Sequence, residues 1–477
     1  MPQGRLHIGL IDADLLAGGT RHPNLALLKI AGFLRDNGFV LNGWDKGAER
    51  SYDLITADKD VTCTLDYDRI YMSRVFSFTA FPACYEWAKN NPEEFAKFQV
   101  GGTGSYANLS VEEGFQEKRC EDMQRLENND NFLSQYVDHK TGANGINMRT
   151  QMPDYHLYDE FVSVMEAAGK SKSYYKDYKE YSIGFLTRGC FRKCPFCVNK
   201  LERSAQRYSQ LEDFLDNERD EKGRLKRPNI YLWDDNFLAS PRWEEMLLEL
   251  QATNRPFQFR QGLDERLLAQ SPKGKRMAEL LSASKYHGDF IFAFDNWFDR
   301  KLIVKALKIW KFYCKKETKF YLFCGFHQSA NDHKLFQKDI AEIFMRIKVL
   351  MTYGCLGYIM RHEDYKKAPI PNIYVQIARW CNQPAFYKKM SFWEFCYRNQ
   401  TYWEEHTLGL VNLPMKSYDE FLEDFEAGYY EDKKICLPLR TFKEFIDSNP
   451  SHRDMFLSFF TLRMREIANP ELWNPNE

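Results

Sequence analysis

Three cysteines are grouped in one short stretch of the chain, as Cys190, Cys194 and Cys197 within residues 187–197. Their C-x3-C-x2-C spacing supplies three thiolates from a single loop. A structural zinc site uses four ligands, usually from paired C-x2-C units, and the nearest histidines are remote in the sequence. A [4Fe-4S] cluster can instead be held by three protein thiolates, which leaves one iron open to a substrate or cofactor. We therefore predict that these cysteines bind a [4Fe-4S] cluster, with zinc as the weaker alternative.

The other nine cysteines stand singly among apolar or aromatic residues, at positions 63, 84, 120, 314, 324, 355, 381, 396 and 436. A disulfide framework is typical of small secreted chains, and this chain has 477 residues and no regular cysteine pairing pattern. We interpret these nine as small core side chains.

The cysteine loop follows a predicted strand, and the elements around it alternate regularly. Strands are predicted at residues 181–187, 229–233, 256–261, 289–294, 319–324 and 354–361. Helices are predicted between them at residues 210–218, 243–253, 276–284, 301–315 and 334–350. Right-handed β-α-β units of this kind favour a partial parallel barrel, in which ligands bind at the carboxyl ends of the strands.

With Phe196 at the aromatic position, the cysteine loop resembles the signature C-x3-C-x-aromatic-C of the radical S-adenosylmethionine (SAM) superfamily. In that family the signature follows the first strand of a partial (β/α)6 barrel. The resemblance implies that the open iron of the cluster binds the amino and carboxylate groups of SAM. Cleavage of the sulfonium would give a 5′-deoxyadenosyl radical that abstracts a hydrogen atom, and the electron would come from a donor such as flavodoxin or ferredoxin.

Polar residues follow the second predicted strand, as Asp234, Asp235 and Asn236. Members of the family commonly place a short polar motif here to bind the ammonium group of SAM, and carboxylates suit that cation. The alternative is a helix cap before Ser240 and Pro241, a role that Asp and Asn often perform.

The third and fourth predicted strands are also followed by candidate SAM ligands. Gln261, Asp264 and Arg266 follow the third strand, in a stretch that is similar to the corresponding one in the branch with an N-terminal cobalamin-binding-type domain. Arg266 is either a partner of the SAM carboxylate or an ordinary salt-bridge residue. Asp295 and Asn296 close the fourth strand, where the family often contacts ribose.

The first hundred residues predict a small parallel α/β domain, with strands at 6–11, 40–44, 68–76 and 97–100 and a helix at 24–37. The start of this helix and the glycine turn at 101–104 resemble the Rossmann-like domain of cobalamin-dependent radical enzymes. The D-x-H-x-x-G signature that supplies a histidine to cobalt is absent, and Asp138-His139 has the wrong spacing. We therefore expect an empty scaffold or a substrate-docking domain here, with bound cobalamin as the alternative.

These predictions together give the domain organisation and fold class. The chain is α/β, with a Rossmann-like domain at residues 1–110, a connecting segment at 111–180, a radical SAM partial (β/α)6 barrel at 181–385 and a mainly helical C-terminal region at 386–477.

Charge and hydropathy limit the partners. The chain has 66 Lys and Arg against 67 Asp and Glu, and the C-terminal region is acidic, so the sequence disfavours tRNA or DNA as a partner. It contains no run of about 18 apolar residues, and we expect a cytoplasmic protein without a membrane span. A small molecule, a nucleotide and a peptide all stay open as substrates.

The predicted function is therefore that of a radical SAM enzyme with an unidentified substrate. One alternative is a non-catalytic iron–sulfur or zinc protein that uses the cysteine triplet structurally or as a redox sensor. Others are a cobalamin-dependent radical methyltransferase or a nucleic-acid modification enzyme, which would need a basic stripe on its folded surface.

Overall fold

A computed structural model describes residues 4–18, 20–57, 63–105, 130–197, 199, 202–409, 413–430 and 435–473. The chain divides into two compact units, Met1–Arg260 and Gln261–Glu477. The predicted boundaries at 110, 180 and 385 remain predictions.

The first unit begins with a five-stranded parallel sheet in the order β2-β3-β1-β4-β5. Its strands are β1 (Leu6–Asp12), β2 (Val40–Leu41), β3 (Arg50–Leu54), β4 (Arg69–Ser73) and β5 (Phe98–Gly101). The central strand β1 is apolar and almost wholly buried, as expected for a parallel sheet that is covered on both faces. The Rossmann-like N-terminal domain is thus confirmed, and β3 is a strand that the sequence analysis missed.

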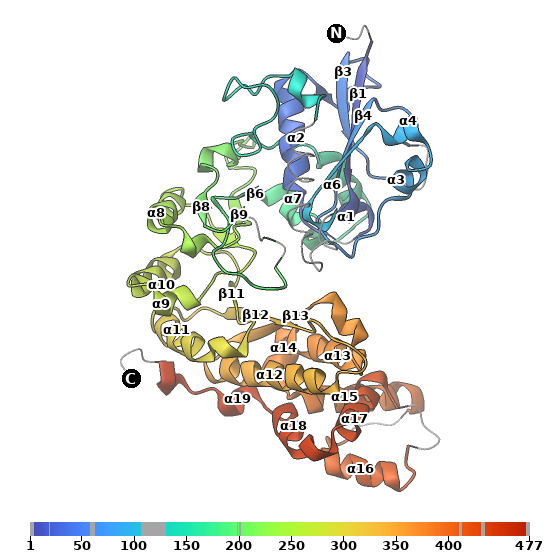
Figure 1. Cartoon of the computed structure of the whole chain (residues 1–477), viewed down its shortest axis with the longest axis vertical. Helices are drawn as coiled ribbons and strands as arrows, with labels where there is room; N and C mark the ends of the chain where they lie inside the picture. Colours follow the sequence, from blue (N-terminus) through green and yellow to red (C-terminus); the bar gives the residue numbers. More distant parts are fainter. Residues whose placement is uncertain are drawn as a thin grey trace. The chain divides into compact units, whose positions relative to one another are not determined.

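Helices cover both faces of this sheet (Figure 1). The helices of the domain are α1 (Ala13–Leu16), α2 (Leu25–Asp36), α3 (Ala83–Ala88) and α4 (Pro92–Phe95). On one face, Leu28 and Leu34 of α2 join Ile8 and Leu10 in one core cluster. On the other face, Cys84 and Tyr85 of α3 pack with Ile11, Ile70 and Met72 of the strands.

The connecting segment belongs to the core of the first unit. Its described elements are η3 (Leu133–Gln135), α6 (Asp159–Ala167), η4 (Lys172–Tyr174) and α7 (Lys176–Glu180). Tyr155, Leu157, Tyr158 and Val162 are buried in the cluster beneath α2. This segment therefore does more than connect two domains, because its aromatic side chains complete the core of the N-terminal domain.

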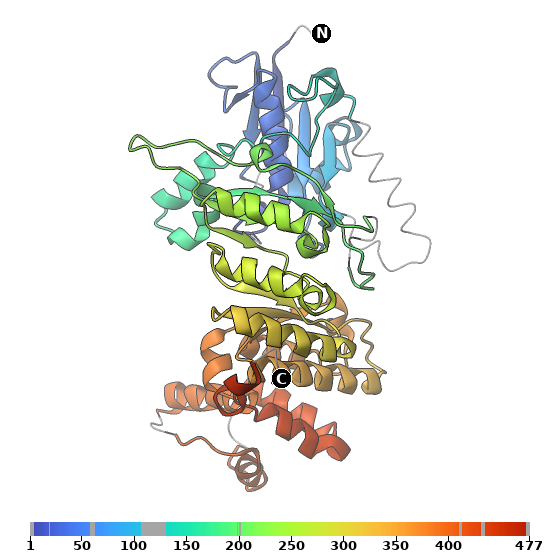
Figure 2. The ribbon, with the colours of Figure 1, turned by 90° about the vertical axis from the view of Figure 1, so that its left-hand side faces the viewer.

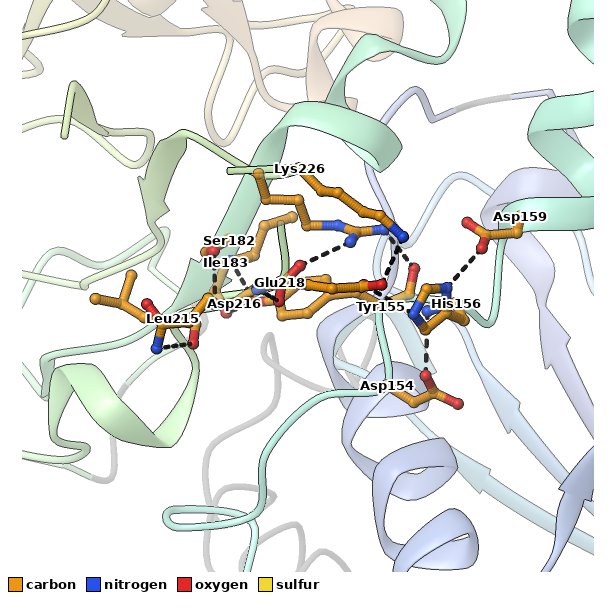
Figure 3. A network of polar contacts seen from close by, with 12 residues as sticks. Asp154, Tyr155, His156, Asp159, Ser182, Ile183, Leu215, Asp216, Glu218 and Lys226 are labelled. Atoms are coloured by element: carbon orange, nitrogen blue, oxygen red, sulfur yellow. Dashed lines mark hydrogen bonds and ion pairs between the residues drawn. The ribbon is translucent and has the colours of Figure 1, made fainter. Parts of the chain in front are cut away.

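A polar network joins the connecting segment to the next sheet (Figure 3). The Tyr155 hydroxyl accepts a hydrogen bond from the Ile183 backbone N–H (2.8 Å) and donates to the Phe214 carbonyl (2.7 Å). The Asp216 backbone N–H donates to the Ser182 hydroxyl (3.0 Å). Through these buried contacts, Tyr155 and Asp216 hold the edge strand of the next sheet in place.

A second parallel sheet in the first unit has the order β10-β9-β6. Its strands are β6 (Tyr181–Gly184), β9 (Asn229–Leu232) and β10 (Phe257–Phe259), and helix α8 (Trp243–Ala252) lies between the last two in sequence. A short antiparallel pair, β7 (Thr187–Arg188) and β8 (Gln206–Arg207), brackets the cysteine loop. The predicted helix at residues 210–218 is wrong: only a single turn forms, η5 (Leu211–Asp213), because Phe214 leaves the helix to enter the core.

The second unit contains the third parallel sheet, in the order β11-β12-β13. Its strands are β11 (Phe290–Ala293), β12 (Thr318–Cys324) and β13 (Leu356–Arg361). The helices that precede or connect them are α9 (Arg266–Gln270), α10 (Gly274–Ala283), α11 (Arg300–Tyr313) and α12 (His333–Thr352). All six predicted strands of the 181–385 region therefore form, in two parallel sheets of three strands each.

The C-terminal region is helical and packs on α12 through aromatic side chains. Its helices are α15 (Phe392–Leu408), α16 (Tyr418–Glu426), α17 (Leu437–Asp447), α18 (Arg453–Phe460) and α19 (Met464–Ile467). They follow α13 (Pro371–Cys381), which lies before the predicted boundary at 385, and α14 (Pro384–Lys389), which crosses it. The ring of Phe460 lies 4.7 Å from Phe344 of α12 and 5.1 Å from Phe442 of α17. The predicted helical character of this region is confirmed.

Candidate functional site

The cysteine loop leaves the carboxyl end of β6 and returns through β8. Cys190, Cys194 and Cys197 are all half-buried, so their thiols lie close to the surface of the loop. Gly189, just before the first cysteine, has φ +95°, and a Cβ there would collide with the Ser204 carbonyl oxygen. Only glycine tolerates both conditions, and it lets the loop turn tightly into Cys190.

Two carboxylates from the end of β9 hold the segment that enters this loop. Asp234 is buried and accepts hydrogen bonds from the backbone N–H groups of Leu186 (3.2 Å) and Thr187 (2.5 Å) and from the Thr187 hydroxyl (2.7 Å). Asp235 accepts from the Gly189 N–H (2.8 Å) and lies 3.4 Å from the Arg188 guanidinium. The polar motif after β9 is therefore attached to the segment that enters the cysteine loop through four hydrogen bonds.

Asn236 reaches the first cysteine directly. Its side-chain Nδ2 donates to Cys190 Sγ at 3.3 Å, and the Arg192 backbone N–H donates to the same sulfur at 3.4 Å. Asn236 stands at the cap position of the short turn η6 (Phe237–Ala239) but makes no side-chain capping bond there. The capping alternative is thus not realised for Asn236, whose amide contacts the thiol instead.

Burial decides the electrostatics of Asp234. It raises the pKa of this carboxyl to about 7, although the three hydrogen bonds from Leu186 and Thr187 act in the opposite direction. Because Asp234 is shielded from solvent, its interactions are with the backbone and hydroxyl groups of Leu186 and Thr187 that surround it.

The donor set of the loop fits a cluster held by thiolates. Two N–H groups point at Cys190 Sγ, and hydrogen bonds to sulfur are a regular means of tuning iron–sulfur clusters. Among the described residues, no three His, Cys, Asp or Glu side chains gather around a single ion position. In a [4Fe-4S] cluster each thiolate binds a different iron, so three ligands need not converge on one point. Phe196 lies half-buried between the second and third cysteines.

In the second unit, the residues after β10 form an ion-pair group. Arg266 donates through Nε to Asp264 (2.6 Å) and through Nη1 to Asp299 (2.8 Å). Its guanidinium therefore has two carboxylate partners within the chain, which is the salt-bridge alternative of the sequence analysis. Gln261 is exposed. Next to this group, Glu265 is buried, accepts from the Ala293 N–H (3.2 Å), and has a pKa that burial raises well above its usual range.

The predicted residues after β11 have local partners. Asn296 is exposed, and its side chain caps the turn η7 (Trp297–Asp299) by accepting from the Phe298 N–H (3.0 Å). Asp295 accepts from the Phe323 N–H (3.2 Å), and burial raises its pKa to about 6 against the opposing charge of Arg346.

The side chains of α12 that organise these strand ends were not predicted from the sequence. Arg346 is buried and donates through Nη1 to the carbonyls of Phe294 (2.9 Å) and Phe323 (3.0 Å). Asp339, two turns earlier, accepts from the Gly325 N–H (2.7 Å). The signal available in the sequence was Arg346, a charged residue on the otherwise apolar buried face of this helix.

The N-terminal domain offers no histidine for cobalt. Both ring nitrogens of His7 are bound, to the Asp66 carbonyl and to Asp53, and those of His22 are bound to Asp177 and Arg260. His139 lies exposed on the connecting segment.

Protein side chains also bridge the carboxyl ends of β1 and β4, the place at which a parallel sheet of this topology binds ligands. The Tyr158 hydroxyl donates to Asp12 (2.8 Å) and accepts from the Asn24 N–H (3.0 Å), and the Asn24 side chain donates to Ser73 (2.8 Å). All four of these residues are buried. The domain as it stands therefore does not fit histidine-ligated cobalamin.

The remaining cysteines behave largely as predicted. Six of them are buried, at positions 84, 314, 324, 355, 381 and 396, and burial raises the pKa of Cys355 to about 12. Cys63 and Cys436 are half-buried, and Cys120 lies outside the described residues. No described helix is both long enough and apolar enough to cross a membrane.

Comparison with known proteins finds relatives among solved structures alone. No family model and no curated protein matches the chain. The structure is similar to TsrM from Kitasatospora setae, a radical SAM methyltransferase solved with cobalamin and a [4Fe-4S] cluster, with 11% identity, a TM-score of 0.43 and 75% of each chain covered. It is also similar to OxsB, a cobalamin-dependent SAM radical enzyme solved with aqua-cobalamin and SAM, with 12% identity and a TM-score of 0.35. That match covers 78% of this chain and 52% of OxsB, so the chain spans about half the length of OxsB. These two solved structures, both of radical SAM enzymes, are what this chain is similar to over about three quarters of its length.

Proposed function

We propose that the protein is a radical SAM enzyme whose cluster is held by Cys190, Cys194 and Cys197. The observation that carries the proposal is the cysteine loop itself, with its C-x3-C-x-aromatic-C spacing directly after a parallel strand and three thiols near its surface. When bound, a [4Fe-4S] cluster with one open iron would hold SAM and deliver the electron that cleaves its sulfonium. We also propose that the two three-stranded sheets are the halves of one partial (β/α)6 barrel.

The chain's own residues have separate tasks in this proposal. Asp234 and Asp235 are positioning residues that fix the backbone at the entrance of the cysteine loop, and Asn236 donates a hydrogen bond to Cys190 Sγ. Gln261, Asp264, Arg266, Asp295 and Asn296 stay the proposed contacts to SAM. The N-terminal domain is proposed as a scaffold or a substrate-docking domain, since its histidines are all engaged.

The test begins with anaerobic reconstitution and measurement of iron, sulfide and 5′-deoxyadenosine after chemical reduction in the presence of SAM. We expect about four irons per chain in the wild type, and loss of iron and of SAM cleavage in the single variants C190A, C194A and C197A. The variant C63A removes another half-buried cysteine and should retain both.

Two results would contradict the proposal. Full iron and sulfide in all three loop variants would remove the cluster assignment. A wild-type protein that holds the cluster but forms no 5′-deoxyadenosine would instead support the alternative of a structural or redox-sensing cluster.

A further inference from the structure

The outer face of α11 concentrates positive charge in a single stripe. Three lysines and one aromatic residue of the helix lie at positions i, i+4, i+7 and i+11 and therefore share one face, and a fourth lysine follows two residues after the helix ends. These residues, which we call the lysine stripe, are Lys301, Lys305, Lys308, Phe312 and Lys315. Helix α11 contains no Asp or Glu that could neutralise them.

The lysines of the stripe are not neutralised by their surroundings either. Within the described part of the chain, Lys301, Lys305 and Lys308 form no ion pair with a carboxylate. The Lys315 ammonium group donates to the carbonyl of Lys311 (2.8 Å), which leaves its charge uncompensated. A stripe of unpaired cations on a folded surface attracts polyanions.

The sequence around the stripe shows that charge is segregated along this chain. Residues 271–319 carry 12 Lys and Arg against 5 Asp and Glu, whereas residues 386–477 carry 11 against 16. Helix α10 packs beside α11 (Figure 2). Its Lys275 is exposed and adds a further positive charge to this part of the chain. The net charge of −1 for the whole chain therefore hides a basic surface of the kind that a nucleic-acid partner requires.

The aromatic member of the stripe points to the kind of polyanion. Phe312 is 50% exposed, between Lys308 and Lys315, although a ring of this size is normally buried. Unpaired bases stack on exposed aromatic rings while neighbouring cations bind the phosphates, whereas an acidic protein surface needs no such ring. From Lys301 to Phe312 the stripe extends about 17 Å along the helix axis, a length that several nucleotides of a single strand can follow.

We propose that the lysine stripe of α11 docks single-stranded nucleic acid, with the lysines on phosphates and Phe312 against a base. The proposal goes beyond the radical SAM function and does not depend on it, because binding can be measured without cluster or SAM. It replaces the expectation from net charge, which disfavoured such a partner.

The experiment measures binding of a labelled 20-nucleotide single-stranded RNA, the matching DNA strand and their duplex by fluorescence anisotropy at several salt concentrations. The variant K301E/K305E/K308E should bind the single strands at least about tenfold more weakly, with a slope of log K against log salt that is shallower by about 2. The variant F312A should weaken binding about fivefold or more and leave the salt slope unchanged. The single strand that binds with the higher affinity identifies whether RNA or DNA is the partner of the lysine stripe.

A charge-matched control is K170E/K222E/K366E, which changes three exposed lysines on other elements. It should bind as the wild type does, and thermal unfolding of both triple variants should show that they fold. Equal loss in both triple variants, or no binding by the wild type, would overturn the proposal. So would competition by poly-glutamate as strong as that by RNA, which would point to an acidic protein as the partner of this face.

Discussion

Asp234 and Asp235 act on the peptide backbone before they can act on any ligand. Their oxygens accept the N–H groups of Leu186, Thr187 and Gly189, the last residues before Cys190. A change at either carboxylate therefore shifts the cysteine loop, and its effect on SAM would pass through the position of the loop. This is why a loss of SAM binding in such a variant does not by itself identify a SAM ligand.

The first prediction concerns the pH dependence that Asp234 gives to folding. Its pKa is about 7 in the folded protein, against the ordinary value of 3.8, because burial disfavours the charged form. The folded state then holds a proton that the unfolded state has lost, so stability falls as pH rises from about 4 to 7, by up to about 1.4 kcal/mol per pH unit. D234N should remove this contribution.

The measurement is the free energy of unfolding in urea at several pH values between about 4 and 8. The variant should be less stable at low pH, because an amide cannot accept all three hydrogen bonds, and its curve should be flatter than that of the wild type. Parallel curves for the two proteins would show that Asp234 titrates normally.

The second prediction concerns Asn236 and the reduction potential of the proposed cluster. A hydrogen bond to a thiolate sulfur stabilises the more negative, reduced state. A net contribution of about 0.5–1.5 kcal/mol corresponds to about 20–60 mV for one electron. N236A should therefore lower the potential by that amount in a spectroscopic redox titration at unchanged iron content. An unchanged potential would mean that the Asn236 amide does not bind the cluster sulfur.

At the scale of the elements, strands with apolar sequences could be predicted from the sequence, whereas a short strand with polar residues could not. The six strands of residues 181–385 carry buried apolar side chains, and all were predictable from that pattern. Strand β3 has the sequence RSYDL, whose polar residues hide a strand held by pairing with β1 and β2. The helix predicted at 210–218 begins with a capping box of Gln210 and Asp213 but ends after one turn, where Phe214 leaves the helix to enter the core.

The cysteines and polar motifs of the site were predictable from their spacing, but their mutual contacts were not. Spacing along the chain places Asp234 after a strand, and only the pairing of β6 with β9 brings it to Leu186 and Thr187. The same holds for Arg346, which reaches the end of β11 from 52 residues away in sequence and the end of β12 from 23 residues away.

The third prediction tests the tight turn into the cysteine loop. Gly189 and Gly223 both have positive φ, of +95° and +75°, so that alanine at either costs about 1–2 kcal/mol of strain. At Gly189 a Cβ would also meet the Ser204 carbonyl, whereas at Gly223 no atom lies within 4 Å. G189A should therefore lower iron incorporation and thermal stability, and G223A should lower stability slightly and leave iron unchanged. Equal iron content in both variants would contradict a structural role for this turn.

At the scale of the whole molecule, the connecting segment makes the first unit one body. Tyr158 donates a hydrogen bond to Asp12 at the end of β1 in the N-terminal domain, while Tyr155 binds the backbone of β6. Arg227 adds a buried pair with Asp216 (2.8 Å) and donates to the Tyr155 carbonyl (2.8 Å). The Rossmann-like sheet and the sheet that carries the cysteine loop are therefore joined through buried groups, and we expect them to unfold together.

The last prediction uses His156, which lies on the surface of the same junction (Figure 3). Its Nδ1 lies 2.7 Å from Asp159 of α6 and its Nε2 lies 3.0 Å from Glu218, in the segment that leads to β9. The hydrogen bond to Asp159, together with the nearby carboxylates, raises the pKa of His156 above its ordinary value of 6.5. The protonated ring can bind both carboxylates at once, whereas the neutral ring can donate to one of them only.

The raised pKa of His156 determines how its contribution to stability changes with pH. The stability that His156 contributes is fully present below about pH 6.5, and it is lost as pH rises through the higher pKa of the folded state. H156Q should therefore destabilise the protein more at about pH 5.5 than at about pH 8.5, in urea unfolding followed by circular dichroism. The control H139Q changes an exposed histidine of the same segment and should have no comparable effect. An equal loss of stability for H156Q at both pH values would show that the ring acts here by packing rather than by its charge.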